Sequence, residues 1–187
     1  MDEVVAEIRT CRRCLLWRSA KNVVPGEGSL DPPIILIGEA PGYWEDIKGR
    51  PFIGASGKLL DKLLSSIELK RCEIYLGNII KHRPPENRNP RLDEIKACTP
   101  FLDRQIKILK PKGIVSLGKY STEYILSKAN IEVRGINSVR GQIYRTRLLD
   151  LPVKILPTLH PAAALYNPNY KSVLKDDFQK IKTELKK

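Results

Sequence analysis

Residues 33–42 read PIILIGEAPG, a short apolar run that ends in a turn rich in glycine and proline. Such a run is long enough for a buried strand and too short for a helix. Three further runs of this kind follow, at Ile74 to Ile80, Gly113 to Leu117 and Val153 to Thr158. The first run, Pro33 to Ile37, therefore predicts the first strand of a sheet.

Helical patterns lie between and after these strands. Apolar residues recur on one helical face from Leu59 to Ile67, from Leu92 to Leu109 and from Leu174 to Leu185. Strands that alternate with helices indicate a parallel sheet covered on both faces. We therefore predict an α/β fold with three layers, α/β/α, around a central, mainly parallel four-stranded sheet. Segment Val133 to Arg147 does not fit a helix, and residues 140–142 predict a turn into a strand pair.

The composition fits one domain with an anionic partner. At 187 residues, with no linker or repeat, residues 1–187 are predicted to form a single domain. Lys and Arg number 33 against 21 Asp and Glu, a formal charge of +12. Such a charge favours nucleic acid as the partner, although a basic but inert surface would give the same count.

The sequence gives no sign of a membrane segment. No stretch approaches the roughly 20 apolar residues of a membrane span, and residues 1–3 include two acids where a signal sequence would be basic and then apolar. We therefore expect a cytoplasmic, nucleoid-associated protein. In a reducing compartment its four cysteines would be buried thiols, metal ligands or nucleophiles rather than disulfides.

Cys11 and Cys14 have the C-x-x-C spacing of a metal or redox site, a spacing that also arises by chance. A thioredoxin-like site is disfavoured because the pair follows a short helical pattern at residues 4–8 rather than a strand. Cys98 lies on the apolar face of its predicted helix, where a small apolar filler is the plainer interpretation.

Three polar side chains stand where predicted strands end. Glu39 follows the first strand, Asn78 lies near the end of the second, and His160 follows the fourth. Because ligands bind at the carboxyl ends of parallel strands, these residues are expected to face one site. The plainer interpretations are an amide bonded to neighbouring backbone and a structural histidine.

A glycine-rich loop at residues 49–57 holds an aromatic ring just before a helix. Phe52 on such a loop can stack on a planar base, although a lone Phe is more often a core residue. Two nucleotide-binding motifs are excluded. Ala40 breaks the Gly-x-Gly-x-x-Gly pattern, and Leu59 stands where a phosphate loop needs Ser or Thr.

Five motifs occur in one order along the chain: the cysteine pair at 11–14, the turn at 38–42, segment 49–54, Asn78 before residues 83–85, and His160 with Pro161. In this combination the sequence resembles the family 4 uracil-DNA glycosylases, a thermophile and bacterial group that carries a four-iron cluster, over nearly its whole length. The acid in the first motif separates this family from family 5. The resemblance implies an enzyme that hydrolyses the N-glycosidic bond of deoxyuridine in double- or single-stranded DNA, releases uracil and leaves an abasic site.

The resemblance also implies roles for individual residues. Glu39 would be the acidic catalytic residue, and His160 would stabilise the departing base. The best-known uracil glycosylases carry an aspartate at the position of Ala40. Because this chain lacks that aspartate, its role is relocated to another residue or shared here. The implied uracil-binding residues are Gly38, Ala40, Phe52 as a stacking ring, and Asn78 as the reader of the pairing edge. The implied DNA contacts are Arg83 and Arg88, with Ala164, Leu165 and Tyr166 in a wedge at Ala164 to Asn167.

The chemistry favours these residue types independently. Breaking an N-glycosidic bond develops positive charge on the sugar and negative charge on uracil O2. A carboxylate near the sugar and a hydrogen-bond donor near uracil O2 therefore both favour the transition state. A base inside a duplex is unreachable and must be flipped into a pocket.

The implied cofactor is a 4Fe–4S cluster with Cys11, Cys14 and Cys98 as three ligands. The family normally has cysteine where this chain has His82, and histidine is a known substitute ligand in iron-sulfur proteins. Cys72 is expected roughly 20 Å from Asn78, as a core residue at the opposite end of an extended strand. We therefore predict His82 at the fourth iron. The alternatives are a three-iron cluster and a cluster weakened by this substitution.

Two other classes of protein compete with this interpretation. A nucleic-acid-binding iron-sulfur protein without activity would use the same basic surface, but pure binding needs no acid such as Glu39 beside phosphates. A cysteine-based redox protein would need a positioned resolving pair. We expect a monomer, with a replication clamp as a candidate partner although no clear clamp-binding motif is found.

Overall fold

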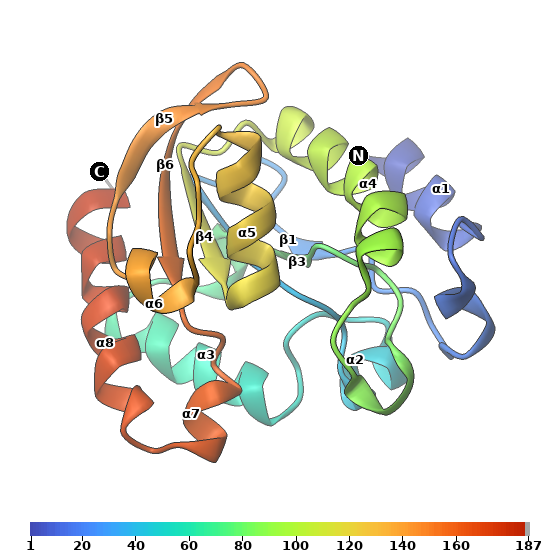
Figure 1. The fold of residues 1–187 in the computed structure, drawn as a ribbon, viewed down its shortest axis with the longest axis horizontal. Helices are drawn as coiled ribbons and strands as arrows, with labels where there is room; N and C mark the ends of the chain where they lie inside the picture. The colour runs from blue at the N-terminus through green and yellow to red at the C-terminus, as the bar shows by residue number, and fades with distance from the viewer. Residues whose placement is uncertain (186–187) are drawn as a thin grey trace.

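The computed structural model describes residues 1–185, in which six strands form one sheet between two layers of helices (Figure 1). The strands are β1 (Glu27–Gly28), β2 (Ile34–Gly38), β3 (Tyr75–Asn78), β4 (Gly113–Leu117), β5 (Tyr144–Leu148) and β6 (Leu151–Thr158). Their order across the sheet is β1-β3-β2-β4-β6-β5. The four central strands are parallel, and the two edge strands pair antiparallel to their neighbours.

The predicted α/β fold is confirmed, with β2, β3, β4 and β6 as the four predicted strands. The sheet has six strands rather than four because β1 and β5 extend its edges. The predicted strand pair is the β5–β6 hairpin, and the predicted turn into it lies at Arg140 and Gly141, just before β5 begins. The two strands are joined by a second turn at Leu149 and Asp150, both with positive φ. Residues 136–139 form a short helix instead of an irregular segment.

The helices are α1 (Asp2–Arg9), α2 (Tyr43–Lys48), α3 (Ala55–Ser66), α4 (Leu92–Leu109), α5 (Lys119–Lys128), α6 (Ile136–Val139), α7 (Ala163–Tyr166) and α8 (Tyr170–Lys180), with a π-helical turn at Ile181–Leu185. The predicted apolar faces correspond to α3, α4 and α8. Helix α5 was not predicted, because its buried residues include the polar pair Ser121 and Thr122.

The two faces of the sheet hold separate apolar cores. On one face, Ile34 and Leu36 of β2 pack with residues of α3 and α8. On the other face, Ile35 and Ile37 pack with residues of α1, α4 and α5. Period-two alternation along β2 therefore supplies both cores, as a strand between two helical layers requires.

The helices that follow the two central strands lie on opposite faces of the sheet. After β2 the chain passes through α3 on one face, and after β4 it passes through α5 on the other. Such a reversal opens a crevice at the carboxyl ends of the two neighbouring strands. Glu39 and Gly118 lie at these two ends. Within residues 1–185 no helix combines the length and apolar character needed to cross a membrane.

Candidate active site

A cavity of about 370 Å³ opens at the carboxyl ends of the parallel strands. It brings together the predicted residues from three strand ends and from the glycine-rich loop. Its lining includes Glu39, Ala40, Glu45, Phe52, Asn78, Asn87, His160 and Tyr166. Glu39, Asn78 and His160 therefore share one pocket, the catalytic pocket, as expected from their places at strand ends.

Glu39 sits against the amino end of α5. Its Oε1 accepts the backbone N–H of Tyr120 at 2.9 Å. Burial raises the pKa of the Glu39 carboxyl, while the N–H groups of Tyr120 and Lys119 oppose that rise. Gly118, at φ +95°, leaves room for this contact, because a Cβ there would lie 2.5 Å from Glu39 Oε1 and 3.1 Å from His160 Cβ. The acid and the histidine thus approach each other around one glycine.

His160 is held as a neutral ring with a defined donor. Its Nδ1 accepts the backbone N–H of Ala162 at 3.1 Å, which leaves Nε2 to carry the proton. Burial lowers the pKa of His160 to about 4, although the carboxylate of Glu45 opposes that shift. At neutral pH the ring is therefore an uncharged N–H donor. It stacks on Phe52 with ring centroids 5.9 Å apart and an interplanar angle of 25°.

Phe52 lies on a loop of unusual backbone shape. It is 4% exposed and has φ +53°, a conformation that non-glycine residues adopt only when their surroundings enforce it. Arg71 donates to the carbonyl oxygens of Pro51 and Phe52, each at 2.8 Å. A Cβ at Gly57 would lie 1.9 Å from the carbonyl oxygen of Phe52, so only glycine fits there.

Glu45 holds the other side of this loop. Its Oε1 accepts the N–H groups of Ile53 and Gly54, both at 2.8 Å, just before α3 begins. The carboxylate therefore serves the amino end of α3, where free N–H groups and the helix dipole favour an anion. Glu45 and Arg71 were not among the predicted residues. The acids at positions 45 and 46, three residues after Gly42 in the stretch PGYWED, were the available signal for Glu45.

Asn78 is 2% exposed, and its Oδ1 is the buried side-chain polar atom in residues 1–185 without a hydrogen-bond partner. Such an atom costs free energy unless a ligand or water pairs with it. Gly38 is the matching neighbour, because a Cβ on it would lie 2.5 Å from Asn78 Oδ1 and 2.6 Å from Phe52 Cζ. The amide therefore points into the catalytic pocket with an acceptor to spare.

Some of the predicted DNA-contacting residues are exposed, whereas others are buried or contact other side chains of the protein. Leu165 and Tyr166 of α7 are 47% and 90% exposed, as a wedge requires. Ala164 is instead 1% exposed and packs in the core, so it is not available to DNA. Arg83 lies over the ring of Tyr43, with 5.1 Å from its guanidinium carbon to the ring centroid.

Arg88 is engaged within the protein. Both of its terminal nitrogens donate to the carboxylate of Glu94, which is 4% exposed and lies in the first turn of α4. A bidentate pair of this kind fixes the preceding loop to the helix. Its guanidinium is therefore engaged within the protein, while 31% of the side chain is exposed, so a contact of Arg88 with DNA stays a prediction.

Cys11, Cys14 and Cys98 lie near one another, whereas Cys72 is exposed elsewhere. Cys98 is buried, and its sulfur accepts the backbone N–H of Lys81 at 3.2 Å, next to His82, which is 8% exposed. Cys11 and His82 line a shared cavity of about 440 Å³. Cys11 and Cys14 lie close enough to Cys98 for their charges to raise the pKa of its thiol, after burial as the main cause.

Cys72 is exposed and precedes β3, on a single helical turn at Arg71–Glu73. Its expected burial is wrong, because the chain leaves the core before the strand begins. Within residues 1–185 no three His, Cys, Asp or Glu side chains are arranged around one metal ion. The ligands of a four-iron cluster hold different irons and stand farther apart. Cys11 and His82 on one cavity, with Cys11 and Cys14 near Cys98, fit such a cluster.

Comparisons with known proteins place this geometry in a family. A family model described as "Uracil DNA glycosylase superfamily" matches residues 25–186. The chain is 46% identical over 186 residues to the type-4 uracil-DNA glycosylase of Saccharolobus solfataricus, covering 99% of this chain and 86% of that protein. It is 47% identical over 183 residues to the type-4 uracil-DNA glycosylase of Sulfurisphaera tokodaii, covering 97% and 83%. A type-5 uracil-DNA glycosylase of Pyrobaculum aerophilum is 27% identical over 135 residues, 64% of this chain and 59% of that one.

Proposed function

The chain belongs to the uracil DNA glycosylase superfamily, and from this membership we propose that it is a uracil-DNA glycosylase that acts in DNA repair. It hydrolyses the N-glycosidic bond of deoxyuridine in DNA. The bond from C1′ to N1 breaks, and its electron pair leaves with uracil. Water adds to C1′ of the sugar and gives up one proton, and uracil takes up one proton. The products are free uracil and an abasic site.

The observation that carries this proposal is the shared pocket of Glu39, Asn78 and His160. We propose that Asn78 reads the base, because an amide can donate to uracil O4 and accept from N3–H. Its unpaired Oδ1 supports that role. Phe52 would stack on the flipped base, with Gly38 and Ala40 leaving room for it.

His160 and Glu39 would divide the charge that develops during bond breaking. The neutral His160 ring would donate from Nε2 to uracil O2 as negative charge grows there. Glu39 would orient the attacking water and stabilise the cationic sugar. A preorganised donor and a fixed carboxylate each favour the transition state over the ground state.

The direct test is release of free uracil from an oligonucleotide duplex with one U·G pair, under single-turnover conditions. The matched substrate carries thymine in place of uracil. We expect release from the first substrate only, and Asn78→Ala should lose most of it. DNA binding without any base release would overturn the proposal and leave a non-catalytic DNA-binding protein.

We also propose that Cys11, Cys14, His82 and Cys98 hold a 4Fe–4S cluster. Bound there, the cluster would cross-link the segment after α1 to α4 and so stabilise the fold, without a part in bond breaking. The cavity shared by Cys11 and His82 supports this ligand set, as does the backbone N–H of Lys81 on Cys98.

Iron and sulfide per chain, measured after anaerobic purification, test this ligand set. His82→Cys should keep the full cluster, His82→Ala should lose part or all of the iron, and Cys72→Ser should change nothing. Iron that falls in Cys72→Ser and stays complete in His82→Ala would refute His82 as a ligand.

The pocket is built from one chain, so we propose that the enzyme acts as a monomer associated with the DNA of the nucleoid. A replication clamp is a candidate partner. Sedimentation of the protein with and without a clamp tests both points, and a clamp that does not alter sedimentation is excluded as a stable partner.

A further inference from the structure

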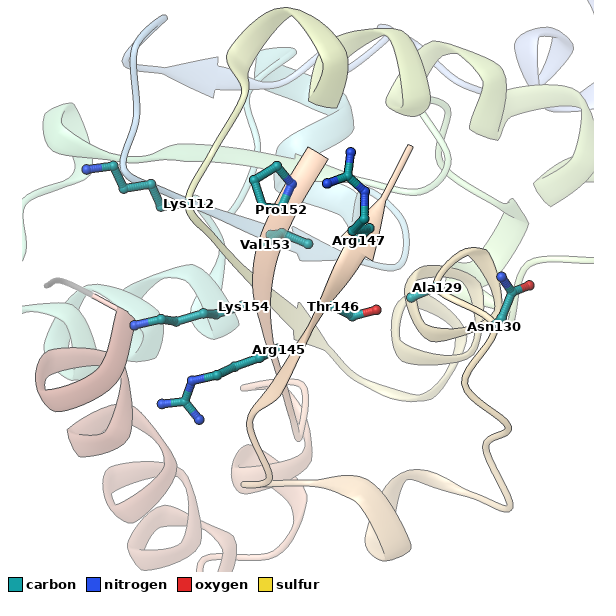
Figure 2. Close-up of a pocket in the computed structure, with 9 residues that line it drawn as sticks. All are labelled: Lys112, Ala129, Asn130, Arg145, Thr146, Arg147, Pro152, Val153 and Lys154. Carbon is teal, nitrogen blue, oxygen red and sulfur yellow. The ribbon is translucent and has the colours of Figure 1, made fainter. Parts of the chain in front are cut away.

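A second cavity lies at the other end of the sheet from the catalytic pocket. It has a volume of about 830 Å³ and is lined by the cations Lys112, Arg145, Arg147 and Lys154, which we call the basic pocket (Figure 2). Lys112 precedes the first residue of β4, whereas Gly118 beside Glu39 follows its last. At about 3.3 Å per residue, the two ends of β4 are roughly 20 Å apart.

Three of these cations form a row across the sheet. Arg145 on β5 is the register partner of Lys154 on β6, and Lys154 in turn pairs with Gly113 next to Lys112. Figure 2 shows the three side chains extending the same way from neighbouring strands. Like charges directly opposite on paired strands destabilise a sheet unless an anion lies between them.

The protein supplies little compensating charge. Glu184 pairs with Arg145 at 2.8 Å. Within the described residues 1–185, the side chain of Lys154 donates to the backbone oxygen of Glu184 alone, and that of Arg147 to the backbone oxygen of Asp150 alone. Among residues 1–185, Lys112 makes no side-chain hydrogen bond or ion pair. In the same part of the chain, residues 1–185, Glu184 is thus the one carboxylate in an ion pair with any of these four cations.

Protection of a sheet edge does not explain this arrangement. Charged residues on an edge strand prevent unwanted pairing, which accounts for Arg145 and Arg147 on β5. Strand β6, however, is paired on both sides, and Lys112 lies before β4 in the interior of the sheet. Edge protection therefore does not explain the positions of Lys112 and Lys154.

We propose that the basic pocket binds the phosphodiester backbone of a second DNA segment, while the catalytic pocket holds the first. Neighbouring strands are about 4.8 Å apart, and each DNA strand carries one phosphate per about 3.4 Å of helix axis, so a row of cations across the sheet can lie along a run of phosphates. DNA as the source of these phosphates rests on the proposed function, since a uracil-DNA glycosylase works surrounded by DNA. A second contact would let the protein pass from one segment to another.

The test is capture of two duplexes by one protein. A short duplex with 2′-fluoro-deoxyuridine, which resists hydrolysis, is fixed to beads and loaded with protein, and a fluorescent uracil-free duplex is then added. The variant is Lys112→Gln with Arg147→Gln. The matched control is Lys62→Gln with Lys107→Gln, which removes the same charge from exposed positions on α3 and α4.

We expect the wild type and the control to capture the second duplex and the basic-pocket variant to bind it at least tenfold more weakly. A plot of the logarithm of the binding constant for the second duplex against the logarithm of salt concentration should also be less steep in the variant. Its slope should change by about 1.8, about 0.9 for each lost phosphate contact. Unfolding midpoints should match in all three proteins.

Equal capture by the basic-pocket variant and the control would overturn the proposal. So would displacement of the second duplex by polyglutamate of equal charge, since the occupant would then be any polyanion. Base release from a short U·G duplex should be unchanged in the variant. A wild type that captures two duplexes but releases no uracil would refute the proposed function and leave the second site standing.

Discussion

At the scale of single residues, one backbone hydrogen bond defines the chemistry of His160. The N–H of Ala162 occupies Nδ1, and burial keeps the ring neutral down to a pKa of about 4. The same ring stacks on Phe52, so its plane is fixed as well as its proton. A donor preorganised in this way does not have to reorient when charge develops on the base.

Replacing Glu39 or His160 by Ala should slow base release by roughly two orders of magnitude, the usual effect of removing one electrostatic contributor. Single-turnover rates on a U·G duplex measure this loss. Glu39→Gln is the control for folding, because its side-chain oxygen can still accept the N–H of Tyr120. Full activity in Glu39→Ala would remove Glu39 from the mechanism.

The rate should also depend on pH through Glu39. The carboxylate form is required, and burial raises its pKa, so activity should fall on acidification at a higher pH than an ordinary Glu would give. His160 stays neutral until about pH 4 and does not contribute above that value. A pH profile of the single-turnover rate checks this, and an acid limb that persists unchanged in Glu39→Gln would contradict it.

At the scale of elements, the loop that carries Phe52 depends on its neighbours more than on its own sequence. Glu45 on α2 and Arg71 before β3 together bond to four successive residues, 51–54, from opposite sides. They stabilise the positive φ of Phe52, which would otherwise be unfavourable. The ring of Phe52, which we propose stacks on the base, is therefore positioned by residues from two other elements.

Glu45→Ala should release this loop, whereas Glu45→Gln keeps an oxygen for the two N–H groups. Bonds to a charged acceptor contribute about 1.5 to 3 kcal/mol each, so the alanine variant should unfold several degrees lower and bind uracil-containing DNA more weakly. Thermal unfolding and KM in base release measure the two effects. If the Gln and Ala variants behave alike, the loop does not depend on this acceptor.

Sequence reasoning succeeded where periodicity carries the signal. Strand β2 and helices α3, α4 and α8 follow from apolar spacing alone, and the strand ends locate Glu39, Asn78 and His160. Helix α5 was missed because its first turn is polar and buried, with Ser121 bonded to the carbonyl oxygen of Leu117. Glu45 was missed because it binds backbone groups, and Arg71 because it binds backbone oxygens together with the acids Glu27 and Asp61. Apolar spacing does not reveal such contacts.

At the scale of the whole molecule, the excess of 33 Lys and Arg over 21 Asp and Glu should dominate binding to undamaged DNA. The logarithm of the binding constant should fall with the logarithm of salt concentration, by about 0.9 for each phosphate neutralised. Fluorescence anisotropy with a uracil-free duplex over a salt series measures this slope. A flat response would show that the basic surface does not contact the backbone.

Cys72 is a suitable site for chemical labelling of the protein. It is the exposed thiol, whereas Cys98 is buried and the pKa of Cys14 is raised by burial, which slows its reaction. Cys11 is partly exposed, but it would be a ligand of the proposed cluster together with Cys14 and Cys98. In the cluster-loaded protein a maleimide dye should therefore attach once per native chain, at the amino end of β3 and away from the catalytic pocket. Intact-protein mass spectrometry would count the labels, and Cys72→Ser should take up none until the chain is unfolded. A dye at this point could follow the protein on DNA without disturbing its chemistry.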